Sequence, residues 1–302
     1  MLAPSPEKAC GVLLDMACHP EIPPPGPPTN RPGPSEVVSN RAVGPGWYVL
    51  RLKETNIARG SKPGQFVQIS CGEEESYDPF LRRPFSVYSV NRKAETYDIL
   101  YTTVGRGTRW MASLVSGTGG LVDAEGPFGN TFTLPGPEDR VYLVGGGVGV
   151  APLYFFAEES LRWKPRITLC MGARTREQLQ GIEDFRKLPI RAETATDDGS
   201  EGFHGRVTGL FERLVEEEKD LGRVRAYGCG PQGMNESLRA CLVERSIWGE
   251  ICLESLMACG FGICFGCVLP LRKEPGGEFY NRRICWEGPV FDARLLHPGI
   301  EG

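Results

Sequence analysis

The stretch RVYLVGGGVGVAPLYFFAEESLR, residues 140–162, places an apolar strand pattern, a run of glycines and a helical pattern in direct succession. A strand that turns through glycines into a helix lets a dinucleotide approach the backbone closely, because glycine has no Cβ. The match to GxGxxG is imperfect, since Pro152 takes the place of the third glycine, and a tight turn of purely structural importance is the alternative. We predict that this turn binds a nucleotide through Gly145, Gly146, Gly147 and Gly149.

Strand and helix patterns continue to alternate after residue 162. They lie in RITLCMGAR, RAETATDDGS and VRAYGCGPQGMNESLRACLVERS. Such alternation implies a parallel sheet with crossover helices, whose strands share one ligand-binding crevice at their carboxyl ends. The third stretch has a strand that ends at Cys229, Gly230 and Pro231. We therefore expect these three residues to contact the nucleotide, with Cys229 facing a nicotinamide.

Short strand patterns separated by Gly, Pro and Asn fill the chain before residue 135. They are WYVLRLK, GQFVQIS, PFSVYSV, YDILYTTV and GLVDAEGPFG. Short β-rich runs at this spacing favour a small antiparallel β-barrel.

Two motifs in the barrel region suggest a flavin site. In RRPFSV, an arginine can pair with a pyrophosphate, an aromatic can cover a flavin ring and a hydroxyl can bond a ring atom; these are Arg83, Phe85 and Ser86. Taken alone, this motif is better explained by a strand-edge arginine with an outward serine. In VGRGT, however, Gly107 and Thr108 begin a helical pattern whose first amides can meet a phosphate. The two motifs together favour a flavin.

The last fifty residues are rich in cysteine and glycine and have little room for a conventional core, so they need an internal staple. The plant-type [2Fe-2S] spacing, CxxxxCxxC followed after seventeen residues by a fourth cysteine, is formed by Cys259, Cys264, Cys267 and Cys285. Gly260, Gly262 and Gly266 allow sharp turns that aim N–H groups at the sulfurs. A zinc site is the alternative, and Cys252 is expected to be a buried thiol.

Composition and charge argue against several classes of protein. The 302-residue chain has a net charge of −4, and no cluster of Lys and Arg predicts a nucleic-acid or membrane surface. The longest uncharged stretch, Val141 to Ala157, is short for a bilayer span and contains four glycines. No secretion signal is recognisable, so a cytoplasmic location is expected. The eleven cysteines then favour metal or redox chemistry over disulfides.

The N-terminal residues 1–35 include ten prolines, which predicts a flexible or polyproline leader in which Cys10 and Cys18 are incidental. The histidines, at positions 19, 204 and 297, are scattered and suggest no catalytic grouping. We assign no catalytic residue from the sequence.

Taken in order, the motifs resemble the ferredoxin-NADP reductase superfamily over residues 36–250, and residues 36–300 resemble its branch of electron-transfer subunits of type B dihydroorotate dehydrogenase. The resemblance rests on RRPFSV, VGRGT, GPFGNTF, VGGGVGVAPL, TDDGS, GCGPQGM, ESLMACGFGICFGCVLP and RRICWEGPVFDA. It implies a multi-domain chain: an antiparallel β-barrel FAD domain (36–137), an α/β parallel-sheet NAD-binding domain (138–250) and a small C-terminal iron-sulfur module (251–302). The leader is not part of the family pattern.

The resemblance also implies site residues. Arg83, Pro84, Phe85 and Ser86 correspond to the FAD motif, Leu100, Tyr101 and Thr102 to the adjoining strand contact, and Gly107 with Thr108 to a phosphate contact. The four cysteines correspond to the cluster ligands.

By the same resemblance, electrons from an FMN-containing dihydroorotate dehydrogenase catalytic subunit reach NAD⁺ through the [2Fe-2S] cluster and FAD of this chain. A heterotetramer with two copies of each subunit is expected, and the chain alone would not oxidise dihydroorotate. Three alternatives stay open: a flavoprotein subunit of a transhydrogenase or sulfhydrogenase, in which Arg174 and Arg176 serve NADP; a stand-alone oxygenase reductase; and a non-redox scaffold with a structural zinc.

Overall fold

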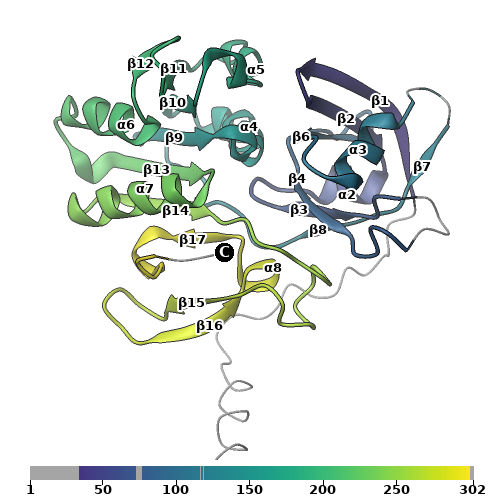
Figure 1. The fold of residues 1–302 in the computed structure, drawn as a ribbon. Coiled ribbons are helices and arrows are strands. Elements are labelled where there is room, and N and C mark those ends of the chain that lie inside the picture. Colours follow the sequence, from purple (N-terminus) through teal and green to yellow (C-terminus); the bar gives the residue numbers. More distant parts are fainter. Residues whose placement is uncertain (1–33, 73–76, 116, 118, 300–302) are drawn as a thin grey trace, which may run out of the picture.

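The computed structural model describes residues 34–72, 77–115, 117 and 119–299. Most of the expected proline-rich leader, including Cys10 and Cys18, lies outside this range. Three regions follow one another along the chain: antiparallel sheets, a mainly parallel sheet with helices on both faces, and a C-terminal segment that packs beneath the parallel sheet (Figure 1). The expected multi-domain fold class is confirmed.

The first region is built from two antiparallel sheets around one core. The five-stranded sheet has the order β5-β6-β2-β1-β7 and the three-stranded sheet the order β4-β3-β8. Alternate residues of these strands, such as Val67 and Ile69, point into a buried core with Leu50 and Ile99. The elements are β1 (Ser35–Gly44), β2 (Trp47–Lys53), α2 (Thr55–Gly60), β3 (Phe66–Ile69), β4 (Arg83–Ser86), β5 (Ser89–Asn91), β6 (Thr96–Thr102), α3 (Arg106–Ser113), β7 (Leu121–Val122) and β8 (Ala124–Phe128).

The second region is a seven-stranded sheet of order β12-β11-β10-β9-β13-β14-β17. Its strands are β9 (Arg140–Gly146), β10 (Arg166–Ala173), β11 (Arg191–Thr196), β12 (Phe203–His204), β13 (Val224–Cys229), β14 (Trp248–Cys252) and β17 (Val290–Asp292). All pairs are parallel except β14 with β17. The helices are α4 (Val150–Ser160), α5 (Ile182–Arg186), α6 (Val207–Glu216) and α7 (Gln232–Glu244).

The helices cover both faces of this sheet because its strands are apolar on both sides. Leu143 of β9 belongs to the core shared with α4 and α5, and its neighbour Val144 belongs to the core shared with α6 and α7. Successive residues of a strand face opposite sides, so an unbroken apolar run requires cover on each face. The parallel order places the glycine turns after β9 and β13 next to each other at the same sheet edge.

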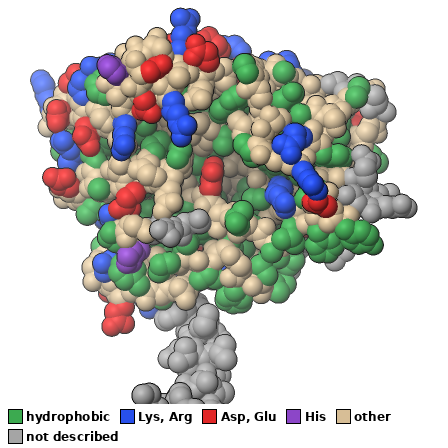
Figure 2. Space-filling view, in the orientation of Figure 1, with side chains coloured by type: hydrophobic (Ala, Val, Ile, Leu, Met, Phe, Trp, Pro, Cys, Tyr) green, Lys and Arg blue, Asp and Glu red, His purple; other side chains and the backbone are tan. Residues whose placement is uncertain are grey.

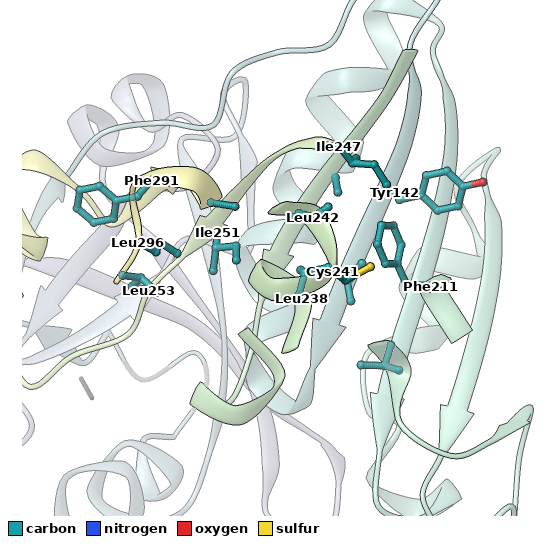
Figure 3. Close-up of a cluster of buried hydrophobic side chains, with 14 of the residues drawn as sticks. Tyr142, Phe211, Leu238, Cys241, Leu242, Ile247, Ile251, Leu253, Phe291 and Leu296 are labelled. Carbon is teal, nitrogen blue, oxygen red and sulfur yellow. The ribbon is translucent and has the colours of Figure 1, made fainter. Parts of the chain in front are cut away.

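The C-terminal segment contains β15 (Val268–Arg272), β16 (Phe279–Arg283), α8 (Ile284–Glu287) and β17. This segment was expected to have little room for a core of its own, and the structure shows how it is held without one. Its apolar side chains, among them Leu296 and Phe291, join Ile251 and Leu238 in one core with the parallel sheet (Figure 3). This shared core replaces the missing one, so the segment is held by more than an internal staple.

The C-terminal segment is also clamped to the barrel. The Asn130 side chain, just after β8, donates to the carbonyl oxygens of Glu287 (3.0 Å) and Val290 (2.7 Å) and accepts from the Val290 N–H (2.9 Å). Gly129 permits this approach, because a Cβ there would lie 2.6 Å from Pro289 Cδ. The segment therefore contacts both other regions.

On the face shown in Figure 2, acidic and basic side chains are interspersed rather than separated by sign.

Candidate functional site

The four cysteines expected to hold a cluster lie close together at the end of the C-terminal segment nearest the barrel. Cys259, Cys264 and Cys267 come from the loop between β14 and β15, and Cys285 comes from α8. Gly260 and Gly262 adopt left-handed φ angles of +79° and +86°, which side chains with a Cβ rarely adopt. The glycines therefore allow the loop to fold back on itself.

The thiols of this loop are surrounded by hydrogen-bond donors. The Gly266 N–H donates to Cys264 Sγ and the Cys285 N–H to Cys267 Sγ, each at 3.4 Å. Burial opposes ionisation of Cys259, but backbone N–H groups of Cys264 and Phe261 outweigh it and lower the pKa of Cys259 to about 7. Such donors stabilise thiolates, the form that binds iron.

The cysteines form two pairs rather than one group. Cys259 is hydrogen-bonded to Cys264. The hydrogen bond from the Cys285 thiol lowers the pKa of Cys267 to about 6, and this pairing with burial raises the pKa of Cys285.

In the part of the chain that the structure describes, no three Cys, His, Asp or Glu side chains meet closely enough to hold a single metal ion. Two thiolate pairs fit a two-iron cluster, in which each iron takes two cysteines, better than one tetrahedral zinc.

The two expected FAD motifs meet at Cys71. A Cβ on Gly107 would lie 2.9 Å from the Cβ of Cys71, so the start of α3 packs directly on this residue. Burial raises the pKa of Cys71 to about 12, and the nearby positive charge of Arg83 opposes that rise. A phosphate placed here would meet both the guanidinium and the N-terminus of α3.

Arg83 and its neighbour Arg82 differ in their partners. Arg82 forms ion pairs with Asp123 (2.5 Å) and Glu125 (3.3 Å). Arg83 is exposed and donates only to the carbonyl oxygens of Leu81 (2.6 Å) and Arg82 (3.3 Å), with no ion pair to any described residue. Its charge is therefore available to an anion.

Several other side chains of the expected FAD site are already engaged in contacts within the protein. Thr108 Oγ1 accepts from the N–H groups of Val104 (2.9 Å) and Gly105 (3.1 Å), so its hydroxyl caps α3. Phe85 packs edge-on against Tyr101 at 6.3 Å, on the barrel-core face of β4. Pro84 and Ser86 occupy the opposite face, while Leu100 and Tyr101 are buried and Thr102 is partly exposed. The FAD contacts of all these residues stay predictions.

The two glycine turns expected to bind the nucleotide are in contact. A Cβ on Gly149 would lie 2.5 Å from the Cys229 carbonyl oxygen, and one on Gly146 would lie 3.1 Å from Pro231. Gly147 has φ +56° and open space where its Cβ would be, so a ligand can approach its backbone.

Cys229, which was expected to face a nicotinamide, is fully buried and hydrogen-bonded to Cys252 across the β13–β14 pair, so its thiol does not reach the crevice surface.

Replacing Gly149 with alanine should weaken nicotinamide-nucleotide binding by roughly tenfold, because overpacking against a backbone carbonyl forces the two turns apart. The measurement is the KM for NADH in a diaphorase assay. Gly233→Ala is the matched control, since a Cβ at Gly233 meets nothing within 4 Å. An unchanged KM in the Gly149 variant, with normal FAD content, would contradict the assignment.

Two features near the expected cofactor sites were not predicted from the sequence. Gln68 is a fully buried polar residue in the apolar strand FVQI, a pattern visible in the sequence. A cavity of about 210 Å³ between α7 and the C-terminal segment borders Gly230 and Pro231. Glu254 lines this cavity. Motif spacing along the sequence cannot reveal either feature, because the surroundings of each come from segments that are distant in the chain.

Comparisons with known proteins agree with this geometry. Residues 254–297 match the family model of the iron-sulfur cluster binding domain of dihydroorotate dehydrogenase B, and residues 143–240 match that of an oxidoreductase NAD-binding domain. The chain is 36% identical over 259 residues to the dihydroorotate dehydrogenase B (NAD(+)) electron transfer subunit of Desulforamulus reducens, covering 86% of this chain and 95% of that one. The corresponding subunit of Geobacillus kaustophilus is also 36% identical, with coverage of 85% and 95%.

Solved structures share the fold. One is the NADH-dependent reduced ferredoxin-NADP oxidoreductase, with a TM-score of 0.76, 25% identity, and coverage of 88% of this chain and 90% of that one. A ferredoxin NADP⁺ reductase from Neisseria gonorrhoeae with bound FAD and NADP has a TM-score of 0.60 at 17% identity, with coverage of 71% and 92%.

Proposed function

Because the chain belongs to the family of electron transfer subunits of NAD(+)-dependent dihydroorotate dehydrogenase B, we propose that it passes electrons from a catalytic dihydroorotate dehydrogenase subunit to NAD⁺. When bound, a [2Fe-2S] cluster supplies single electrons, and FAD can take them one at a time and release them as a pair to nicotinamide. The chain's own residues bind, orient and separate these groups. The thiolate pairs of the C-terminal loop would hold the iron.

The observation that carries this proposal is the contact between the cysteine loop and the barrel. Phe261 lies between Cys259 and Cys264 in the sequence. Its ring centre is 6.3 Å from that of Phe128 in β8. Gly260 packs on Gln68 of β3, the strand that pairs with the FAD motif of β4. A cluster and a flavin held by these segments would be neighbours, as electron transfer requires.

The partner is expected to cover the outer side of the cysteine loop. Leu256, Ile263 and Phe265 are exposed to 89%, 73% and 47%, and Cys264 itself is exposed. Large apolar side chains gathered at one loop mark protein–protein contact more often than a free surface. We propose that an FMN-containing catalytic subunit docks here, in an assembly with two copies of each chain.

Arg83 and the α3 N-terminus would hold the FAD pyrophosphate, and the turns at Gly147 and Gly230 would hold the nicotinamide nucleotide. Val150, which follows the first turn, shares a core with Leu100 of β6. This contact supports an arrangement in which flavin and nicotinamide meet where the barrel touches the parallel sheet. FAD and NAD⁺ held by these residues would be neighbours, as hydride exchange between them requires.

NADH should reduce the bound flavin at least about tenfold faster than NADPH at equal concentration, because one of the two arginines expected to bind a 2′-phosphate is already paired with an acidic side chain. Arg176, which could pair with that phosphate, is bound to Glu201 at 3.3 Å. The Arg176 N–H also contacts Ser200, whose hydroxyl donates to Asp198 and lowers the pKa of that carboxyl. Stopped-flow flavin reduction with each nucleotide measures the ratio. A preference for NADPH would instead favour the transhydrogenase alternative.

The test of the proposed function is anaerobic purification of the full chain together with a catalytic dihydroorotate dehydrogenase subunit. We expect FAD, two irons per chain, and dihydroorotate-dependent reduction of NAD⁺ by the complex only. A colourless chain without iron or flavin would refute the proposal and favour the zinc-containing scaffold.

A cytoplasmic location is part of the proposal. Among the residues described, no helix is long and apolar enough to cross a bilayer. The nine cysteines in those ranges all have free thiols, which suits a reducing compartment.

A further inference from the structure

Gln68 is a buried amide without a partner among the described residues. It lies on β3 with a relative exposure of 0%, and neither its Nε2 nor its Oε1 makes a hydrogen bond within the described part of the chain. An unsatisfied polar group in the interior destabilises a protein, and a leucine or methionine would fill the same space without that penalty. The amide is therefore expected to have a partner that is not part of the polypeptide.

The surroundings of Gln68 show where that partner lies. A Cβ on Gly260 would be 2.6 Å from Gln68 Nε2 and 2.6 Å from its Cγ, so the side chain lies directly against the backbone of the cysteine loop. Gly260 follows Cys259, the first of the four clustered cysteines. In the β3–β4 pair, Gln68 stands opposite Pro84 and Phe66 opposite Ser86, which places Gln68 on the same face as this part of the FAD motif.

The left-handed Gly260 makes this approach possible. A residue with a side chain at this position would be strained by its φ of +79° and would push the Gln68 amide away from the loop. The loop and β3 thus enclose a carboxamide between the cysteines and the flavin motif. The strongest acceptors available beside Cys259 are the sulfur atoms of a cluster.

We propose that Gln68 donates a side-chain N–H to a sulfur of the [2Fe-2S] cluster, next to Cys259, and so joins the barrel to the electron carrier. This inference rests on the proposed function, since it needs the cluster. Hydrogen bonds to cluster sulfurs favour the reduced, more negative state and raise the reduction potential. Gln68 would therefore set the potential of the cluster relative to the flavin.

The test is Gln68→Leu in the full chain with FAD and cluster bound. We expect the equilibrium for reduction of the cluster to fall about tenfold, a decrease of about 59 mV for a one-electron couple. The FAD potential should stay unchanged. Redox titration followed by EPR measures the cluster, and pulsed EPR should detect a nitrogen coupling in the wild type that the variant lacks.

Gln65→Leu is the matched control. Its carboxamide, just before β3, is hydrogen-bonded to Gly129 O (2.9 Å) and the Lys62 N–H (2.9 Å), so its removal should leave the cluster potential unchanged. If Gln68→Leu does not load iron, Gln68→Met, which is unbranched, replaces it.

A shift of the flavin potential alone, or no shift at all, would overturn the inference. Either result with normal iron content would leave the proposed function intact, whereas absence of iron from the wild type would refute that function.

Discussion

Changing Cys264 to serine should remove more than about 90% of the cluster iron while much of the FAD stays bound, because each iron needs two thiolates and Cys264 is one of the pair with Cys259. Cys264 is exposed, so the substitution disturbs no core packing. The FAD motif and the start of α3 lie in the barrel and do not depend on this thiol. Iron analysis, the visible spectrum and flavin released by acid measure both outcomes.

Cys241→Ser is the control for the cysteine substitution. Cys241 is buried on α7 in the core with Leu242, and burial raises the pKa of its thiol to about 11, as expected for a thiol that binds no metal. This variant should keep its iron. Retention of a full iron complement by Cys264→Ser would disprove the ligand assignment.

Replacing Arg83 with alanine should weaken FAD binding by about 10- to 100-fold, the effect of losing a charge-assisted hydrogen bond of about 1.5–3 kcal/mol. The reason is the availability of its guanidinium beside the first turn of α3. The dissociation constant of FAD, measured by fluorescence titration of deflavinated protein, tests this expectation.

Arg82→Ala separates a specific contact from a general loss of charge. It removes the same charge one residue away, but from a side chain already paired with Asp123 and Glu125. Its FAD affinity should change by less than about threefold, since surface ion pairs contribute little. If FAD affinity falls equally in both variants, the positive charge of the region as a whole, and not a specific contact of Arg83, would bind the phosphate.

The parts of this protein that could be predicted from sequence are those governed by neighbours along the chain. The strand, glycine turn and helix at 140–162 are local, and so is the spacing of the first three cysteines. The fold class followed from the alternation of such patterns. The pairing of β14 with β17 was not visible in the sequence, because 37 residues separate Cys252 from Val290 and β17 has only three residues.

Contacts between distant segments also account for the site features that the sequence did not reveal. The burial of Cys229 depends on its register with Cys252, which the glycine pattern does not encode. Thr108 was expected to contact a phosphate, which stays a prediction; the sequence did not reveal that its hydroxyl caps α3. The position of Gln68 beside the cysteines could not be predicted from the sequence, because it depends on the loop that begins at residue 253 and packs against β3.

The clamp formed by Asn130 has a consequence for the rate at which electrons move. Tunnelling slows steeply as the gap between donor and acceptor widens, so small relative motions of two domains would change the rate greatly. Three hydrogen bonds from one side chain to Glu287 and Val290 hold the edge of the barrel to the segment that carries Cys285. A cluster and a flavin held on the two sides of this clamp would therefore be expected to keep their separation while nucleotide binds at the parallel sheet.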